Sequence, residues 1–375
     1  TTVVILLFSG LCVQGSVGRV QNSTASHCEL QSRRRMLENL ISDPKAEFQR
    51  IRNLAKETCA CEQAHRAITG EGEKRYAFAT FIHTSTSYLC GALGLGYSFK
   101  NRLKQRPGDP PVELVALLTK DSEKAGPVLE KNGWKVRVMP NIRNPYLPPS
   151  MHSSNQNNWN KLQYWTLTEY DRVLAMDSDM LVKDDLSWLF ELPPLVGQVY
   201  RGVFGSNNLL LEPSLCTFAY MLGNSSLSPA ARMDPKSKNF YLKVGDQMFI
   251  NKYWKTFHLP FTPIGSHNNS PVVKKPGVNP EAYRRGERSV TLQHFSGIQE
   301  KFKNRDINET WKENGDTITY LHYFGKKPWM CKSRAADCNG ENFRDPALYS
   351  MYWKFFNEMP TSAQQDCIVN GAPAK

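Results

Sequence analysis

Residues 170–182 read YDRVLAMDSDMLV, an apolar run that carries the chain to two carboxylates, Asp177 and Asp179, before a second apolar stretch. A run of this length with many β-formers is typical of a buried strand. In extended chain, residues i and i+2 point to the same side, so both carboxylates can face one cation. Open α/β sheets bind ligands beyond the carboxyl ends of their strands, so the stretch predicts a site for a metal and an anionic substrate. The competing interpretation is a solvated turn, in which Asp-x-Asp is common.

The chain before this stretch alternates strand and helix patterns. The stretches 76–82 (YAFATFI), 112–118 and 134–139 predict strands, and helices are expected at 88–104 and 121–131. Because this order is typical of strands joined by crossover helices, it predicts an α/β fold with a parallel, doubly wound sheet.

Further elements surround and follow the Asp-Ser-Asp stretch. A short helix is expected at 159–168, from which Lys161 is free to project, and another at 244–254, near the acidic Asp246. The remaining strands are expected at 199–204 and 209–212, which flank a polar connection at 205–208, and at 317–321.

The 375 residues, of which 40% are hydrophobic, can build a sizeable core. The chain opens on an apolar run followed by small residues, which is typical of a secretory signal or, with a longer run upstream, of a membrane anchor. We therefore divide the chain into a signal peptide or anchor remnant at 1–20, a stem at 21–74, a main domain at 75–330 and a cysteine-containing C-terminal extension at 331–375.

The cysteines also favour the secretory pathway. Beyond Cys12 there are eight, an even number that suits disulfides in an oxidising lumen, although the sequence leaves their pairing open. A zinc site is less favoured, because Cys59-x-Cys61 and the Cys331–Cys338 pair lack the usual ligand spacing. Glycosylation sequons that agree with this compartment begin at Asn22, Asn224, Asn268 and Asn308.

The net charge of +12 raises the question of a nucleic-acid partner. Lysine and arginine are scattered along the chain, and no zinc-finger or RNA-recognition signature is present, so we expect no nucleic-acid binding. The basic balance instead suits an anionic substrate or an acidic acceptor.

Several separated stretches carry a family resemblance: YAFATFIHTSTSYLCGALGLG (76–96), NKLQYWTLTEYDRVLAMDSDMLV (160–182), GDQMFINKYW (245–254) and LHYFGKKPWMC (321–331). Together they resemble the family 8 glycosyltransferases, the glycogenin-like group, and more closely the plant glycogenin-like glucuronosyltransferases that act on xylan. The resemblance runs in order from about 76 to 360. It implies a GT-A fold, which is a Rossmann-like mixed sheet with the nucleotide-sugar site at the carboxyl ends of the strands. It also implies a UDP-sugar donor, a divalent cation that is usually Mn²⁺, and retention of anomeric configuration.

The resemblance assigns roles to individual residues. Asp177, Asp179 and His322 would hold the metal, and Gly325 and Lys327 would meet the diphosphate. A carboxylate pair with an imidazole shifts preference from Mg²⁺ towards Mn²⁺, and a lysine can stabilise the charge that develops on a leaving diphosphate. The other assignments are Thr84 and Tyr88 at the uridine, Ser178 within the donor-binding turn, Lys161 near the donor, and Asp246 with Gln247 as the catalytic pair at the sugar and acceptor.

Structural interpretations compete with these roles. His294 shares the His-x-x-Gly spacing of His322, which is preferred because only it precedes Lys-Pro-Trp. The other competing interpretations are a core histidine for His322, a helix cap for Asp246, ordinary surface for Lys161, a helix cap for Thr84 and a core position for Tyr88.

One departure from the family concerns the donor sugar. Relatives have Asn-Ser-Gly where this chain has Gly205-Ser206-Asn207, so glucuronate, glucose, galactose and N-acetylglucosamine all stay open as the transferred sugar. Arg143 and Arg172 are candidates to pair with a uronate carboxylate.

The sequence therefore predicts a retaining, manganese-dependent glycosyltransferase that uses a UDP-sugar and a glycan acceptor, with a polysaccharide favoured over lipid or protein. We expect it in the secretory pathway, in the Golgi lumen on an N-terminal anchor or secreted. The alternatives are a self-glucosylating or lipid- or protein-directed transferase, and a non-catalytic relative that binds nucleotide sugar or glycan.

Overall fold

The structure is a computed structural model, and it describes residues 59, 73–82, 86–147, 156–192, 195–200, 203–237, 240, 244–257, 262–264, 319–323, 327–330 and 346–370. The predicted leader and almost all of the predicted stem lie outside the described residues.

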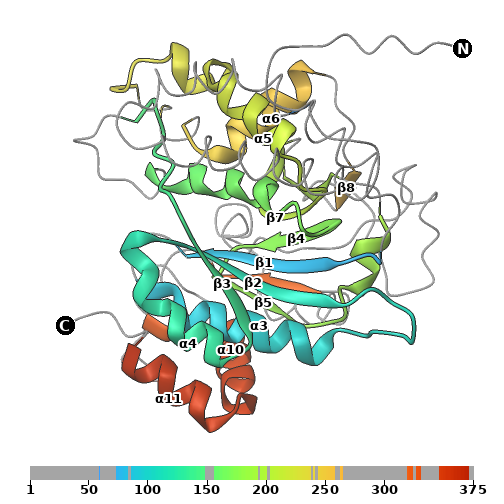
Figure 1. Cartoon of the computed structure of the whole chain (residues 1–375). Helices are drawn as coiled ribbons and strands as arrows, with labels where there is room; N and C mark the ends of the chain where they lie inside the picture. Colours follow the sequence, from blue (N-terminus) through green and yellow to red (C-terminus); the bar gives the residue numbers. More distant parts are fainter. Residues whose placement is uncertain are drawn as a thin grey trace, which may run out of the picture.

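Strands and helices follow the predicted alternation through the first half of the chain (Figure 1). The strands are β1 (Tyr76–Ile82), β2 (Val112–Thr119), β3 (Trp134–Met139), β4 (Arg172–Met176), β5 (Met180–Val182), β6 (Val196–Tyr200), β7 (Val203–Leu211), β8 (Thr262–Ile264) and β9 (Tyr320–His322). The α-helices are α3 (Leu89–Arg102), α4 (Gly126–Lys131), α5 (Leu215–Gly223), α6 (Asp246–Thr256), α10 (Pro346–Glu358) and α11 (Thr361–Asn370). Short 3-10 segments include η1 (Thr86–Tyr88), η2 (Lys120–Ala125), η4 (Asn158–Thr166), η5 (Ser187–Glu191) and η9 (Pro328–Met330).

The main sheet has seven strands in the order β3-β2-β1-β4-β7-β6-β8, and β5 and β9 form a separate two-stranded sheet. The four strands β3, β2, β1 and β4 run parallel, as the crossover pattern predicts. Strand β7 runs antiparallel to both β4 and β6. The sheet is therefore mixed rather than wholly parallel, and the predicted α/β class with a doubly wound mixed sheet is confirmed.

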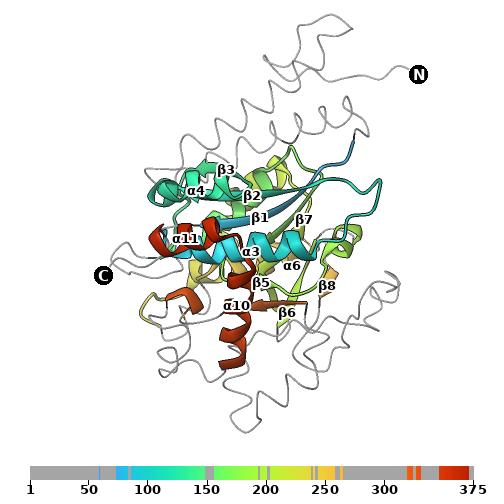
Figure 2. The same cartoon turned by 90° about the horizontal axis from the view of Figure 1, so that it is seen from below.

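Helices cover both faces of the sheet, with α3, α4, α10 and α11 on one side and α5 and α6 on the other (Figures 1 and 2). Side-chain alternation along β1 and β4 supplies both cores. Phe78 and Leu174 enter the core beneath α3 and α10, whereas Ala79 and Ala175 enter the core beneath η4, α5 and α6. Helices from both layers therefore pack against the central strands β1 and β4.

Two predictions for this half of the sheet are wrong. The single strand expected at 199–204 is instead divided between β6, which ends at Tyr200, and β7, which begins at Val203 and pairs antiparallel to it. Residues 205–208, expected as a connection, lie inside β7, which pairs Asn208 with Met176 of β4. Contacts outside β7 help to hold the segment there: the Asn208 side-chain amide donates to the Tyr320 hydroxyl of β9, and the Asn207 backbone carbonyl accepts from the Asp177 backbone N–H at 2.9 Å. Residue polarity had suggested a loop, but the backbone pairing decides for a strand.

Disulfides tie distant segments to this core, as the cysteine count predicts. Cys90 of α3 bonds to Cys367 of α11, and Cys59 bonds to Cys216 of α5. Helix α10 places Tyr352 and Phe356 in the core beneath α3. Within the residues described, no helix combines the length and apolar character that a bilayer crossing requires.

Candidate active site

The two carboxylates of the Asp-Ser-Asp stretch lie just beyond the carboxyl end of β4. The extended geometry expected for them is not what the structure shows, because residues 178–179 form a turn that the Met180 N–H closes onto the Asp177 carbonyl at 3.1 Å. The turn still brings both carboxylates together. Asp179 is 9% exposed and the Asp177 side chain 20% exposed, so the solvated-turn interpretation is wrong.

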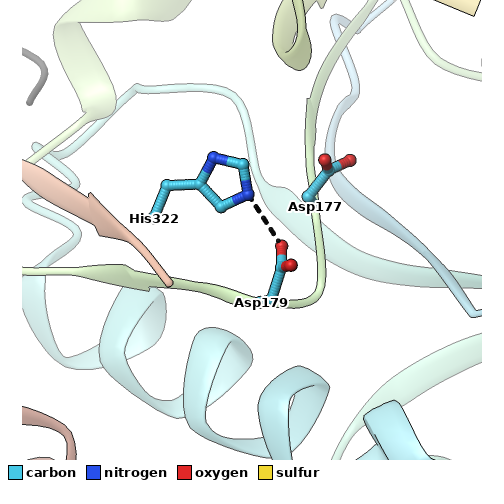
Figure 3. A group of neighbouring side chains, drawn as sticks. All are labelled: Asp177, Asp179 and His322. Carbon is cyan, nitrogen blue, oxygen red and sulfur yellow. Dashed lines mark ion pairs between the residues drawn. The ribbon is translucent and has the colours of Figure 1, made fainter. Parts of the chain in front are cut away.

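His322 reaches the same place from a segment far along the chain. It ends β9, which pairs with β5 so that His322 lies opposite Met180, and the next backbone N–H donates to the Asp179 carbonyl at 2.9 Å. Its Nε2 lies 3.1 Å from Asp179 Oδ1, and Figure 3 shows the imidazole directed at the two carboxylates. One ligand atom from each of the three residues lies within 4.8 Å of the others.

This donor set fits a divalent cation. Two carboxylates from one turn and one imidazole from β9 leave further positions for phosphate oxygens or water, and a mixed oxygen and nitrogen set is what Mn²⁺ accepts readily. The rival histidine, His294, lies outside the described residues.

Two buried lysines flank the carboxylates. Lys161 on η4 places its Nζ 2.6 Å from Asp177 Oδ1, and Lys327 places its Nζ 2.6 Å from Asp179 Oδ2. Lys161 is 9% exposed, which contradicts its interpretation as ordinary surface. Both ammonium groups are therefore positioned to meet an anionic ligand at the same edge of the sheet.

The pKa values of the two carboxyl groups shift in opposite directions. Burial raises the pKa of Asp177, and the nearby Lys161 offsets this only in part. Burial acts in the same direction on Asp179, but His322 and Lys327 outweigh it and hold the pKa of that carboxyl well below its usual range. Asp179 is thus the more strongly ionised member of the pair.

Asp246 stands at the start of α6, where it is 3% exposed. The helix cap is Gly245, so the interpretation of Asp246 as a cap is not supported. Burial lowers the pKa of the Lys161 ammonium, but the carboxylates of Asp177 and Asp246 raise it more. The Asp246 carboxylate is therefore near enough to the Lys161 ammonium to stabilise its charge. Gln247 follows it, half-buried, and its carbonyl accepts from the Asn251 side-chain amide at 2.7 Å.

The residues assigned to the nucleotide are described only in part. Tyr88 is half-buried, its ring packs edge-on to Trp329, and Lys327 Nζ lies 5.8 Å from the ring centroid. Burial, with the charges of Asp179 and Asp177, raises the pKa of Tyr88 to about 12. Ser178 is buried in the Asp-Ser-Asp turn. Thr84 and Gly325 lie outside the described residues.

Arg172 does not serve the role considered for it. It begins β4, at the end of the strand opposite Asp177, and its guanidinium donates to the carbonyl oxygens of Phe190 and Leu192. The other candidate, Arg143, is exposed in the segment after β3.

Sequence reasoning missed one residue of this environment, Tyr164. It follows Lys161 by three residues on η4, it is 1% exposed, and the charges of Asp177 and Asp246 act on its hydroxyl. The i, i+3 spacing from Lys161 was a usable signal, because residues three apart lie on the same side of a 3-10 helix.

Comparisons with known proteins identify the homologues of the chain. No protein-family model matches it. The UDP-glucuronate:xylan alpha-glucuronosyltransferase 1 of Arabidopsis thaliana is 27% identical over 79% of this chain and 39% of that protein. Galactinol synthase 2 of the same plant is 29% identical over 76% of this chain and 82% of that protein. The glycogenin of Komagataella phaffii is 27% identical over 56% of this chain and 54% of that protein. The resemblance drawn from the sequence motifs is confirmed by these homologues.

The chain spans 39–47% of the length of the five xylan-directed relatives that it matches. Among solved structures, the glycosyltransferase GlyE of Streptococcus pneumoniae matches with a TM-score of 0.45 at 16% identity, over 81% of this chain and 66% of that one. A complex of the galactosyltransferase LgtC with donor and acceptor sugar analogs matches with a TM-score of 0.40 at 15% identity, over 76% and 96%.

Proposed function

Given this homology to family 8 glycosyltransferases, we propose that the protein is a metal-dependent, retaining glycosyltransferase that moves a sugar from a UDP-sugar to a glycan acceptor. The observation that carries the proposal is the cluster of Asp177, Asp179 and His322 beyond the carboxyl end of β4, with ligand atoms within 4.8 Å of one another. A cluster of this composition between two buried lysines suits a metal ion and a diphosphate together.

The residues take the following roles in the proposal. Asp177, Asp179 and His322 hold the cation, Mn²⁺, which when bound supplies Lewis-acid stabilisation of the diphosphate leaving group. Lys327, which is 7% exposed in its side chain, gives a fixed positive charge on the Asp179 side of the site. Lys161 gives a second positive charge on the Asp177 side. Thr84, Tyr88, Ser178 and Gly325 complete the nucleotide-binding set.

Asp246 and Gln247 are proposed as the catalytic pair. A buried carboxylate on the Asp177 side of the site can accept a hydrogen bond from a sugar hydroxyl or stabilise positive charge at the anomeric carbon. The names of the five xylan-directed relatives support glucuronate as the donor sugar and a polysaccharide as the acceptor. The 205–208 segment adjoins the metal residues, because the Asn207 carbonyl accepts from the Asp177 backbone N–H. Since this segment is where the chain departs from its relatives, the donor panel below includes other sugars.

We propose residues 75–330 as the catalytic domain and the Golgi lumen as the working compartment. The Cys90–Cys367 and Cys59–Cys216 disulfides support an oxidising compartment.

The test is UDP binding and UDP release by the purified protein against UDP-glucuronate, UDP-glucose, UDP-galactose and UDP-N-acetylglucosamine, with Mn²⁺ and then with chelator. We expect chelator-sensitive binding of UDP, and chelator-sensitive release of UDP from UDP-glucuronate as the glucuronosyl group passes to water. Asp177→Asn should abolish the response to Mn²⁺, because it removes an anionic ligand.

Asp171→Asn is the matched control. Asp171 lies just before β4, at the opposite end of the strand from Asp177, and accepts from the Arg75 N–H at 2.7 Å. It should keep metal-dependent binding. Folded wild-type protein that binds no UDP in the presence of Mn²⁺ would contradict the proposed function.

A further inference from the structure

Tyr164 occupies the carboxyl edge of the central strands. Its ring packs edge-on to Phe81 of β1, with ring centroids 6.3 Å apart and an interplanar angle of 82°. The β1–β4 register pairs Ala79 with Ala175, and Phe81 and Asp177 each follow two residues later. Phe81 and Asp177 therefore stand at the same level of the sheet, with Tyr164 packed over that level.

The Tyr164 hydroxyl is buried without a hydrogen-bond partner among the residues that the structure describes, and so is Asp246 Oδ2. Buried polar atoms are nearly always hydrogen-bonded, so each exception calls for an explanation. Burial raises the pKa of Tyr164 well above its ordinary value, and the nearby carboxylates of Asp177 and Asp246 raise it further. The phenol is consequently a neutral hydroxyl at every physiological pH, with a proton to donate.

The surroundings indicate which part of a ligand this hydroxyl suits. The Lys327 ammonium, 2.6 Å from Asp179 Oδ2, gives the Asp179 side of the site a positive charge that suits phosphate. Tyr164 lies on the Asp177 side, on the same 3-10 helix as Lys161, and that helix packs against α6, which Asp246 begins, through the stacked rings of Trp159 and Phe249. A neutral donor beside a carboxylate acceptor matches the hydroxyls of a sugar, which both accept and donate hydrogen bonds.

We infer that Tyr164 binds the transferred sugar of the donor, with its hydroxyl donating to a sugar oxygen in the subsite next to Asp246. This inference rests on the proposed function and adds to it a specificity-determining residue that the sequence motifs did not assign. It also explains why a buried phenol has no partner within the described part of the protein: its acceptor arrives with the substrate.

Tyr164→Phe tests the inference, because it removes the hydroxyl and keeps the ring against Phe81. In the presence of Mn²⁺, affinities are measured by calorimetry for UDP and for UDP-glucuronate, with UDP-glucose in parallel. We expect the variant to bind UDP as the wild type does and to bind the UDP-sugar about fivefold to tenfold more weakly, the loss typical of one hydrogen bond. Tyr170→Phe is the control, since it removes a part-buried tyrosine hydroxyl that donates to Glu113 at 2.6 Å, at the opposite end of β4 from Asp177. It should leave both affinities unchanged.

Thermal unfolding of the ligand-free variant supplies a second measurement. A hydroxyl without a protein partner contributes nothing to the fold, so Tyr164→Phe should melt at or above the wild-type temperature. A lower melting temperature, or failure to fold, overturns the inference, because the hydroxyl then serves the core. Unchanged UDP-sugar affinity, or equal losses for UDP and UDP-sugar, overturns it as well. Wild-type protein that binds no UDP signals failure of the proposed function, whereas normal wild-type binding with an unaffected variant signals failure of this inference alone.

Discussion

Gly91 of α3 lies directly against the backbone carbonyl of Ser178, the middle residue of the Asp-Ser-Asp turn. A Cβ at Gly91 would stand 2.2 Å from that oxygen and 2.5 Å from the ring of Trp329. The backbone of α3 therefore supports the turn from below, and only a residue without a side chain allows this approach. Displacing this carbonyl would shift the turn that carries Asp177 and Asp179.

Gly91→Ala should therefore weaken metal binding without touching a ligand. The methyl group must displace the Ser178 carbonyl, and with it the two carboxylates, so we expect Mn²⁺ affinity to fall about tenfold and stability to fall by about 1–3 kcal/mol. Metal titration and thermal unfolding measure the two effects. Gly126→Ala is the control, because a Cβ there meets its nearest neighbour, Val136, at an ordinary 3.5 Å. Wild-type Mn²⁺ affinity in Gly91→Ala would show that the turn does not depend on α3.

Replacing Lys161 should separate cation binding from turnover. The Lys161 ammonium 2.6 Å from Asp177 repels a cation at the same carboxylate, so Lys161→Met should show a larger thermal stabilisation by Mn²⁺ than the wild type. Turnover should nevertheless fall about 10-fold to 100-fold, because a charge that stabilises the leaving diphosphate is lost.

The control for this prediction is Lys135→Met. Lys135 also lies 2.6 Å from a carboxylate, that of Glu113, but its side chain is 55% exposed and belongs to the other end of the sheet. It should change neither quantity. Equal or weaker stabilisation of Lys161→Met by Mn²⁺ would contradict the electrostatic argument.

The disulfide between Cys90 and Cys367 should make a large contribution to stability. It joins residues separated by 277 positions and fixes α11 against α3, so the double variant Cys90→Ala/Cys367→Ala should lose about 2–5 kcal/mol of unfolding free energy. Denaturant unfolding measures the loss. UDP binding at low temperature should persist, because neither cysteine is among the proposed ligands, and a loss below about 0.5 kcal/mol would contradict the prediction.

Stability should depend on acid pH through Glu113, remote from the site. Burial raises the pKa of this carboxyl, but the bonds from Lys135 and Tyr170 outweigh burial and lower it below the ordinary value of 4.5. A lowered pKa in the folded state means that the stabilisation is present above about pH 5 and is lost as pH falls below the ordinary value. Glu113→Gln should thus cost about 1 kcal/mol at pH 7 and less near pH 3, by denaturant unfolding.

Glu123→Gln is the comparison for that series. Its carboxylate pairs with the exposed Lys120, and an exposed pair of this kind contributes little. The substitution should leave stability nearly unchanged at both pH values. A cost for Glu113→Gln that stays constant between pH 3 and pH 7 would show that the charge of Glu113 is not what stabilises the fold.

Local patterns were enough to predict the first part of the fold. Strand β1 begins and ends where the apolar run YAFATFI does, because a central strand covered on both faces needs continuous apolar residues. Strand β3 coincides with WKVRVM, in which charged and apolar residues alternate as suits a strand at the edge of the sheet. The candidate metal residues were also found in the sequence, through motif spacing and family resemblance. Residues 205–208 were misjudged because their polarity favours a loop, whereas their place in β7 depends on pairing with β4, which no local window contains.

By itself, the sequence of this protein determined the chemistry available to the site: two acidic residues after an apolar strand, a histidine before a lysine, and a lysine on a short helix. Only the tertiary structure decided that Lys161 pairs with Asp177, that Lys327 and His322 pair with Asp179, and that Tyr164 joins Asp246 in their surroundings. The physical reason is that these ion pairs and contacts join segments far apart in the sequence, and that the pKa shifts of their side chains depend on burial in the folded protein. The contacts and the burial both come from the pairing of β9 with β5 and from the packing of α6 on the sheet, which local sequence propensity does not determine.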